Sequence, residues 1–356
     1  MVRVSHVGLG PQPATMLEQL LLRVVTDETP AEVRVAVAAL TQAIQDVTDT
    51  PRPLLSVIMR TQGTRLEALA DALSSLAEQS SQDFEVLLIV HSGDSDARGR
   101  VENVIAGQPE SIREKIALMM LRGGGRSAPL NFAIPSAGGR YLAVFDDDDL
   151  LLPGWVASFA RSEIAAGGRL MRARVGTQNV TVTPADGDQP AVVLASSIRD
   201  DYPARFDSLR QFELNASPFM GWAFPRALFT RLGVRFNEDL QLLEDWDVVL
   251  RGGTLLGVHQ IDELTAVYRR WSTGDSSMAT SPSEAWSVAE MQLIRALNSA
   301  PVLLDVGAVQ RLRKLLAKSD ELDSMRSSRS WRLALAIRRV VNTVRRILPK
   351  GVEGGK

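Results

Sequence analysis

Four consecutive carboxylates stand out in this sequence of 356 residues: Asp146 to Asp149, in the segment YLAVFDDDDLLLPGW, directly behind an apolar run. Four adjacent like charges repel one another, and a carboxylate is costly to bury without a counter-charge. Such a group needs a cation, a cap or full solvation. An exposed acidic turn is one interpretation. In the other, Asp146 and Asp148 direct their carboxylates at one hard divalent cation, whose remaining oxygen ligands come from water and a diphosphate.

A second acidic pair lies in the segment LLEDWDVVLR, where Glu244 and Asp245 precede residues with helical spacing. Adjacent residues on a helix point about 100° apart, so one carboxylate can face a site while the other orients it. A carboxylate in such a position can act as a general base. The alternative is that both are ordinary first-turn acids, which the helix dipole favours.

The elements that must position these acids have a βαβ pattern. Residues 54–61 and 84–93 are short apolar runs, and residues 65–79 between them have helical spacing. Residues 140–145 predict a later strand of the same kind, so the four aspartates fall at its carboxyl end. A βαβ crossover requires a parallel sheet with helices on its faces, and ligands of such sheets bind at the carboxyl ends of the strands.

Helical patterns flank this α/β segment. Residues 15–48 predict two helices, residues 284–317 have helical spacing, and residues 319–330 are typical of a polar linker. Residues 331–348 predict a basic amphipathic helix, because eight Lys or Arg and no acid lie between residues 326 and 350. We therefore expect an N-terminal helical extension over 1–50, a central α/β domain over 53–273 and a C-terminal helical region over 284–350.

The composition excludes several classes of protein. A formal net charge of −2 with 23% charged residues gives no overall attraction to nucleic acid, so we expect no nucleic-acid partner. The absence of cysteine excludes disulfides, thiolate zinc sites and cysteine nucleophiles, and it fits a reducing cytoplasm. The chain has no run of about 18 apolar residues and no signal-peptide pattern. We therefore expect a cytoplasmic protein that does not span a membrane.

Four segments, taken in order, resemble the inverting nucleotide-sugar glycosyltransferases of the GT-A fold, family 2 type: PLLSVIMRT, LSSLAEQSSQDFEVLLI, GRSAPLNFAIPSAGGRYLAVFDDDDLLLPGW and LLEDWDVVLR. The resemblance covers about residues 53–273. It implies an α/β fold of the GT-A type, which is a Rossmann-like mixed sheet flanked by helices, here with N-terminal and C-terminal helical extensions. It also implies a nucleotide-sugar donor, a glycan or lipid-linked acceptor, and Mn²⁺ or Mg²⁺ as cofactor.

The resemblance assigns roles to individual residues. It implies a metal site at Asp146 and Asp148 and a general base at Asp245, with Glu244 as the fallback. Trp222 lies where the family places acceptor-facing residues and could stack on a sugar ring, although core packing is the equal alternative. The donor-binding or nucleotide-binding residues implied by the resemblance are Arg60, Thr61, Asp94, Arg126, Asn131, Asp146 and Asp147.

Two segments depart from the family's pattern. The family usually has an acidic residue after the second strand, whereas this chain has VHSGDSD, so Asp94 or Asp96 would have to replace it. Many relatives have a histidine as third metal ligand, whereas this chain has Trp271 in VYRRWSTGDSS. Asp148, the diphosphate and water would then hold the metal.

These features together predict a metal-dependent inverting glycosyltransferase, hexosyltransferase-like. The resemblance implies that it serves cell-surface polysaccharide or glycolipid synthesis. The alternative is a catalytically silent protein of the same fold that binds a glycan or a partner. A nucleotidyltransferase is disfavoured, because MRTQGTRLE is a poor phosphate loop. The basic C-terminal helix either docks on the enzyme or on a second subunit of a homo-oligomer, or attaches the protein peripherally to the anionic inner face of a membrane.

Overall fold

The computed structural model describes residues 15–45, 52–183, 192–272, 283–331, 333–335 and 337–338. The chain divides into two compact units, one ending at Leu303 and the other beginning at Leu304. The first unit contains the sheet. The described part of the second unit is α13 (Ala308–Ser327) followed by further helical residues.

The first half of the sheet is parallel, as the βαβ pattern predicts. Its strands pair in the order β3, β2, β1, β4. Ile58 pairs with Val144, so the residues that follow, Arg60 and Asp146, reach the same edge of the sheet. The elements are β1 (Leu55–Thr61), α3 (Leu66–Ala77), β2 (Phe84–His91), α4 (Ala97–Ala106), α5 (Glu110–Arg113), β3 (Ile116–Leu121), α6 (Ala128–Ala133), η1 (Ile134–Ser136) and β4 (Tyr141–Val144).

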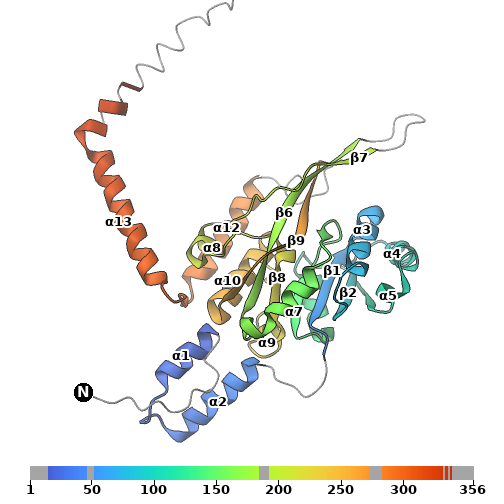
Figure 1. Cartoon of the computed structure of the whole chain (residues 1–356), viewed down its shortest axis with the longest axis horizontal. Helices are drawn as coiled ribbons and strands as arrows, with labels where there is room; N and C mark the ends of the chain where they lie inside the picture. The colour runs from blue at the N-terminus through green and yellow to red at the C-terminus, as the bar shows by residue number, and fades with distance from the viewer. Residues whose placement is uncertain are drawn as a thin grey trace, which may run out of the picture. The chain divides into compact units, whose positions relative to one another are not determined.

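The second half makes the sheet mixed, which confirms the predicted fold class. Strand β8 pairs antiparallel with β4 and β6, and the long strands β6 and β9 run parallel side by side (Figure 1). Strands β5 and β7 pair antiparallel with β9 and β6. The elements are β5 (Leu150–Leu151), α7 (Trp155–Ala166), β6 (Leu170–Thr183), β7 (Val192–Ala195), α8 (Ser208–Glu213), η2 (Phe219–Gly221), β8 (Trp222–Pro225), α9 (Arg226–Thr230), α10 (Glu244–Leu256), β9 (Val258–Trp271) and α12 (Ser283–Asn298).

Apolar side chains fill both faces of the sheet. One cluster joins β1 and β2 to α3, α4 and α7, where Trp155 and Phe159 meet edge to face. The other joins the sheet to α6, α9 and α10 and includes Trp222, Phe224 and Phe229. Strands buried on both faces read as continuous apolar runs, which is why β1, β2 and β4 show no alternation in the sequence. Polar groups therefore gather where these strands end.

The two helices predicted before the sheet are α1 (Met16–Val24) and α2 (Ala31–Gln45). Helix α1 begins at a capping box, because the Thr15 hydroxyl accepts from the amide of Glu18 and the Glu18 carboxylate accepts from the amide of Thr15. Helix α1 contacts α10, and α2 contacts α9. Both helices therefore pack on the same unit as the sheet.

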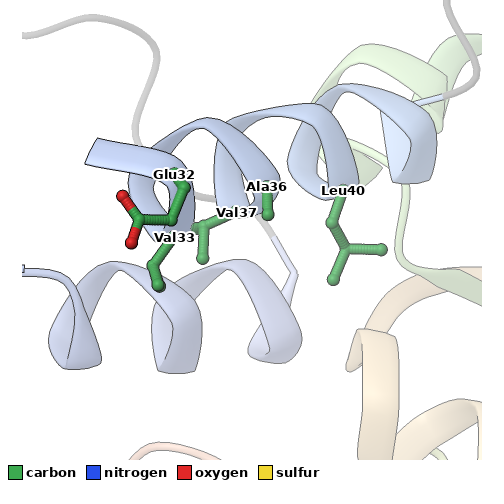
Figure 2. A pocket seen from close by; sticks show the side chains of 5 residues that line it. All are labelled: Glu32, Val33, Ala36, Val37 and Leu40. Atoms are coloured by element: carbon green, nitrogen blue, oxygen red, sulfur yellow. The ribbon is translucent and has the colours of Figure 1, made fainter. Parts of the chain in front are cut away.

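One side of α2 borders an apolar pocket of about 410 Å³. Val33, Val37 and Leu40 project from this side of the helix (Figure 2). Among the described residues that line this pocket, only Glu32 has a charged side chain. The described lining thus offers one carboxylate and no basic group that would bind a phosphate.

The polar linker predicted over residues 319–330 is wrong, because α13 continues to Ser327. Leu315 and Leu322 are one heptad apart, and the Leu, Lys, Glu and Met residues around them favour helix even where the composition is polar. The predicted basic helix over 331–348 lies largely outside the described residues. None of the helices in the described part of the chain is long and apolar enough to cross a membrane.

Candidate active site

The four aspartates lie between β4 and β5, and arginines face them instead of solvent. Asp146 accepts from Arg60 Nε at 2.9 Å. Asp147 accepts from the hydroxyl of Thr61 at 2.5 Å and from Arg65 Nη2 at 2.8 Å. Arg65 Nη1 donates to Asp148.

Asp149 completes the cluster. Its Oδ1 accepts from the backbone amide of Arg269 at 2.8 Å, while its Oδ2 is buried without a hydrogen-bond partner in the described structure. Asp147 and Asp149 are only 4% and 1% exposed. The interpretation of this run as an exposed acidic turn is therefore wrong.

The cluster does not readily hold four negative charges. Burial raises the pKa of Asp147 to about 6 and also raises the pKa values of Asp148 and Asp149. Burial acts in the same direction on Asp146, but the nearby charges of Arg60 and Arg126 outweigh it and lower the pKa of Asp146. The cluster as a whole thus favours additional positive charge.

Carboxylate oxygens are the ligands that Mg²⁺ and Mn²⁺ prefer, so the donor set at this edge fits a hard divalent cation. Six carboxylates face four guanidiniums here, which leaves an excess of negative charge when all are ionised: Asp146, Asp147, Asp148, Asp149, Glu244 and Asp245 against Arg60, Arg65, Arg126 and Arg269. Among the described residues, however, no group of three or more His, Cys, Asp or Glu is arranged as a metal site. A cation on Asp148 would have to compete with Arg65.

Trp271 lies beside the aspartate run, where the resemblance expects a third metal ligand. Its indole Nε1 donates to the carbonyl of Asp148 at 3.2 Å, and the Arg269 guanidinium lies 4.7 Å from its ring centroid. An indole has no lone pair for a metal. This residue therefore supports the backbone of the aspartate run.

Glu244, at the start of α10, binds two arginines. Its Oε1 accepts from Arg60 Nη1 at 2.9 Å and from Arg126 Nε at 3.0 Å. Burial opposes the ionisation of Glu244, but the charges of Arg60 and Arg126 outweigh it and hold its pKa below the usual value. A carboxylate that binds two guanidiniums is a poor proton acceptor, which argues against Glu244 as the fallback base.

Asp245, the next residue, is held differently. Its Oδ2 accepts from Asn215 Nδ2 at 2.7 Å, and its Oδ1 accepts from the backbone amide of Trp246 at 2.8 Å. Burial, and then the neighbouring charge of Glu244, raise the pKa of Asp245 to about 6. A half-buried carboxylate with a pKa raised to about 6 has the property required of a general base.

The backbone before this pair is unusual. Leu243 precedes α10 with φ at 67°, the left-handed region, which side chains other than Gly, Asn and Asp seldom adopt. Its side chain packs in a cluster with Trp246, Leu250 and Leu293. This packing holds the turn that directs Glu244 and Asp245 into the site.

A pocket of about 230 Å³ brings much of the predicted site together. Five predicted residues line it: Arg60, Arg126, Asp146, Glu244 and Asp245. Other lining residues were not predicted as site residues, and four of them bring polar or aromatic side chains from outside the strands: Tyr202, Asn215, Ser217 and Trp286. They come from irregular segments and from α12, and no periodic pattern or known motif singles them out.

Four further predicted residues do not line the pocket. Thr61 and Asp147 bind each other just behind it. Asp148 is held by Arg65. Asp94 follows β2, where it pairs with Arg100 at 2.7 Å.

The remaining two predicted residues, Trp222 and Asn131, contact other parts of the chain, and the predicted sugar contact of Trp222 is wrong. Trp222 is 0% exposed and packs between Phe206 and Phe224, so it offers no face to a sugar. The side-chain amide of Asn131 donates to the carbonyl of Phe236 and to Glu238, and its oxygen accepts from the amide of Phe236. Asn131 therefore fastens the loop after α9 and does not line the pocket.

Comparison with known proteins shows a likeness between part of this chain and one family. Residues 56–162 match the model of the family described as glycosyl transferase family 2. This part of the chain is therefore similar to that family. It matches the uncharacterized glycosyltransferase MJ1057 of Methanocaldococcus jannaschii at 29% identity over 102 residues, which is 29% of this chain and 34% of that protein. The chain thus spans about a third of the length of that relative.

Two further likenesses extend beyond the matched segment. The uncharacterized glycosyltransferase YwdF of Bacillus subtilis is 26% identical over 216 residues, which is 60% of this chain and 74% of that protein. The crystal structure of S. aureus TarS 1–349 in complex with UDP-GlcNAc has a TM-score of 0.53 at 17% identity and covers 71% of this chain and 68% of that one. The TarS likeness confirms the GT-A fold predicted for the glycosyltransferase domain.

Proposed function

We propose that the protein is an inverting glycosyltransferase in which Asp245 removes the proton from an acceptor hydroxyl. The observation that carries this proposal is the contrast within one acidic pair. Glu244 is neutralised by two arginines, whereas Asp245 lies in the same pocket with its pKa raised to about 6. At neutral pH such a carboxylate is mostly ionised and ready to accept a proton.

A nucleoside-diphosphate sugar is the proposed donor, and TarS, a protein of the same fold bound to UDP-GlcNAc, supports this choice. Arg60 and Arg126 line the pocket and bring guanidiniums suited to a diphosphate. Asp146 and Asp148 would hold Mn²⁺ or Mg²⁺, which would neutralise charge on the departing diphosphate. This division places the donor diphosphate on the Asp146 side of the pocket.

The proposed reaction is a single displacement. The acceptor oxygen bonds to the anomeric carbon as its proton passes to Asp245. The bond from that carbon to the diphosphate oxygen breaks, and the nucleoside diphosphate leaves with the electron pair. Attack opposite the leaving group inverts the anomeric configuration.

Nucleotide binding tests the donor assignment. UDP, GDP, ADP and CDP are compared by thermal unfolding, each with and without Mn²⁺. One of them is expected to raise the melting temperature, since a ligand at 100 times its Kd stabilises the folded state by about 2.7 kcal/mol. Mn²⁺ is expected to increase the shift, and a shift equal with and without the metal would contradict the role given to Asp146 and Asp148.

A catalytically silent, glycan-binding protein is the alternative. Wild-type protein that binds a nucleotide but neither transfers nor hydrolyses any sugar would support it.

The acceptor proposed for an active enzyme is a glycan or a lipid-linked glycan. Transfer to such an acceptor would serve the assembly of cell-surface polysaccharide or glycolipid.

The basic C-terminal segment is proposed to attach the protein to an anionic membrane surface. Trp331, Leu333 and Ile337 are exposed, and eight basic residues between 326 and 350 are accompanied by no acid. Each basic residue near an anionic surface contributes roughly 1 kcal/mol. The full chain is expected to co-sediment with phosphatidylglycerol vesicles but not with phosphatidylcholine vesicles, and high salt is expected to weaken the binding.

Truncation after Ser328 keeps α13 and should remove vesicle binding while leaving nucleotide affinity unchanged. Equal sedimentation of truncated and full-length protein would contradict membrane attachment. The segment would then dock either on the enzyme itself or on a second subunit of a homo-oligomer. The sedimentation coefficient of the full chain without vesicles would distinguish these two arrangements.

A further inference from the structure

Helix α12 brings an aromatic side chain to the pocket. Trp286, Ala289 and Leu293 share one face of this helix, since they are three and four residues apart. Ala289 and Leu293 are buried, and Leu293 packs with Trp246 and Leu250 of α10. The same face therefore directs Trp286 toward the pocket, which its half-exposed side chain lines.

Two residues that line the same pocket, Ser217 and Asn215, each have a polar atom without a hydrogen-bond partner within the described part of the chain. These atoms are the hydroxyl of Ser217 and the amide oxygen Oδ1 of Asn215, both buried. The other end of the Asn215 amide donates to Asp245 at 2.7 Å. A buried polar group without a partner costs stability, so these atoms need a reason to be there.

We propose that Trp286, Ser217 and Asn215 form the acceptor subsite of the pocket and that its ligand is a pyranose ring with free hydroxyls. This inference rests on the proposed function, because it places the acceptor beside the base Asp245. It replaces Trp222, which is buried, with Trp286 as the aromatic residue that meets the acceptor.

The chemistry of the wall selects this class of ligand. A sugar ring has an apolar face that packs on an indole, and hydroxyls around its edge that can both donate and accept hydrogen bonds. Such hydroxyls can satisfy the amide oxygen of Asn215 and the hydroxyl of Ser217 together. An alkyl alcohol would satisfy at most one of them and would leave the other buried without a partner.

Binding of methyl pyranosides tests the subsite without requiring turnover. Saturation-transfer NMR is recorded on the full chain with methyl pyranosides of glucose, galactose, mannose and N-acetylglucosamine, and with n-butanol, each with and without UDP. At least one pyranoside is expected to bind, and n-butanol is not. Trp286→Ala and Ser217→Ala are each expected to weaken that binding at least tenfold.

The Ser217→Ala variant separates a ligand role from a structural one. Because the hydroxyl of Ser217 has no partner in the described structure, its removal should leave the melting temperature of the free protein unchanged or higher. Met291→Ala is the matched control for Trp286, since Met291 lies on the same helix and is 57% exposed. This control should bind the pyranoside as the wild type does.

The outcomes separate this inference from the proposed function. If no pyranoside binds the wild type, or if Trp286→Ala and Ser217→Ala bind as tightly as the wild type, the subsite assignment is overturned. Binding that depends on both residues supports the subsite even in a protein without transferase activity, and the proposed function would then be the claim that fails.

Discussion

Asp245→Asn is expected to lower turnover by about two to four orders of magnitude while nucleotide binding is retained, as for the loss of a general base. Asparagine has nearly the shape of aspartate and can still meet the side chain of Asn215, but it cannot take a proton. The measurement is initial-rate kinetics of donor consumption at saturating donor, together with the nucleotide-induced thermal shift.

The pH dependence follows from the pKa of Asp245, which is about 6 in the folded protein. Only the ionised carboxylate accepts a proton, so kcat/KM should rise with pH through about 6 and level off above it. Because the folded-state pKa lies above the ordinary value for aspartate, ionisation of Asp245 destabilises the fold, and this cost is fully present above pH 6. Asp245→Asn should therefore melt at a higher temperature than the wild type at pH 7.

Asp247→Asn is the matched control, because Asp247 lies on the same helix but pairs with Arg251 and does not line the pocket. This variant should lose some stability through its broken ion pair and keep its turnover. Full activity in Asp245→Asn, combined with an inactive Glu244→Gln, would move the base to Glu244.

The sequence predicts the position of the aspartate run because few physical rules decide it. Strands β1 and β4 are apolar throughout, and strands of that kind belong in a parallel sheet whose carboxyl ends share one edge. This reasoning places Arg60 and Asp146 together, and they form an ion pair. The same reasoning could have found Arg65, since the loop after β1 is the nearest source of positive charge.

The positions of the other pocket residues, Asn215, Ser217 and Trp286, could not be predicted in this way. Asn215 and Ser217 lie in an irregular segment, and Trp286 lies on a helix about 70 residues further along the chain. Their meeting depends on how α12 packs on α10, which no local spacing encodes. Trp222 shows the opposite error, since it was predicted to contact a ligand and lies in the core. An aromatic residue in an apolar segment gives the same sequence pattern in either position.

Asp148→Asn is expected to remove metal-dependent nucleotide binding and to lower turnover by more than about three orders of magnitude, if this carboxylate helps to hold the cation that neutralises the leaving group. The free protein should remain folded. Burial raises the pKa of Asp148 above the ordinary value, so its charge destabilises the fold at neutral pH, and a neutral amide removes that cost. The measurement is thermal unfolding at pH 7 with nucleotide, Mn²⁺, both or neither.

The control for this substitution is Asp262→Asn, since Asp262 is exposed on β9 and does not line the pocket. It should match the wild type in every condition. A substitution of Arg65 adds a second test, because Arg65 binds both Asp147 and Asp148 and competes with any cation for them. If Arg65 instead of a metal neutralises the cluster during catalysis, Asp148→Asn will keep its nucleotide binding and Arg65→Gln will lose it. That pattern would assign the role of the cation to an arginine of the chain itself.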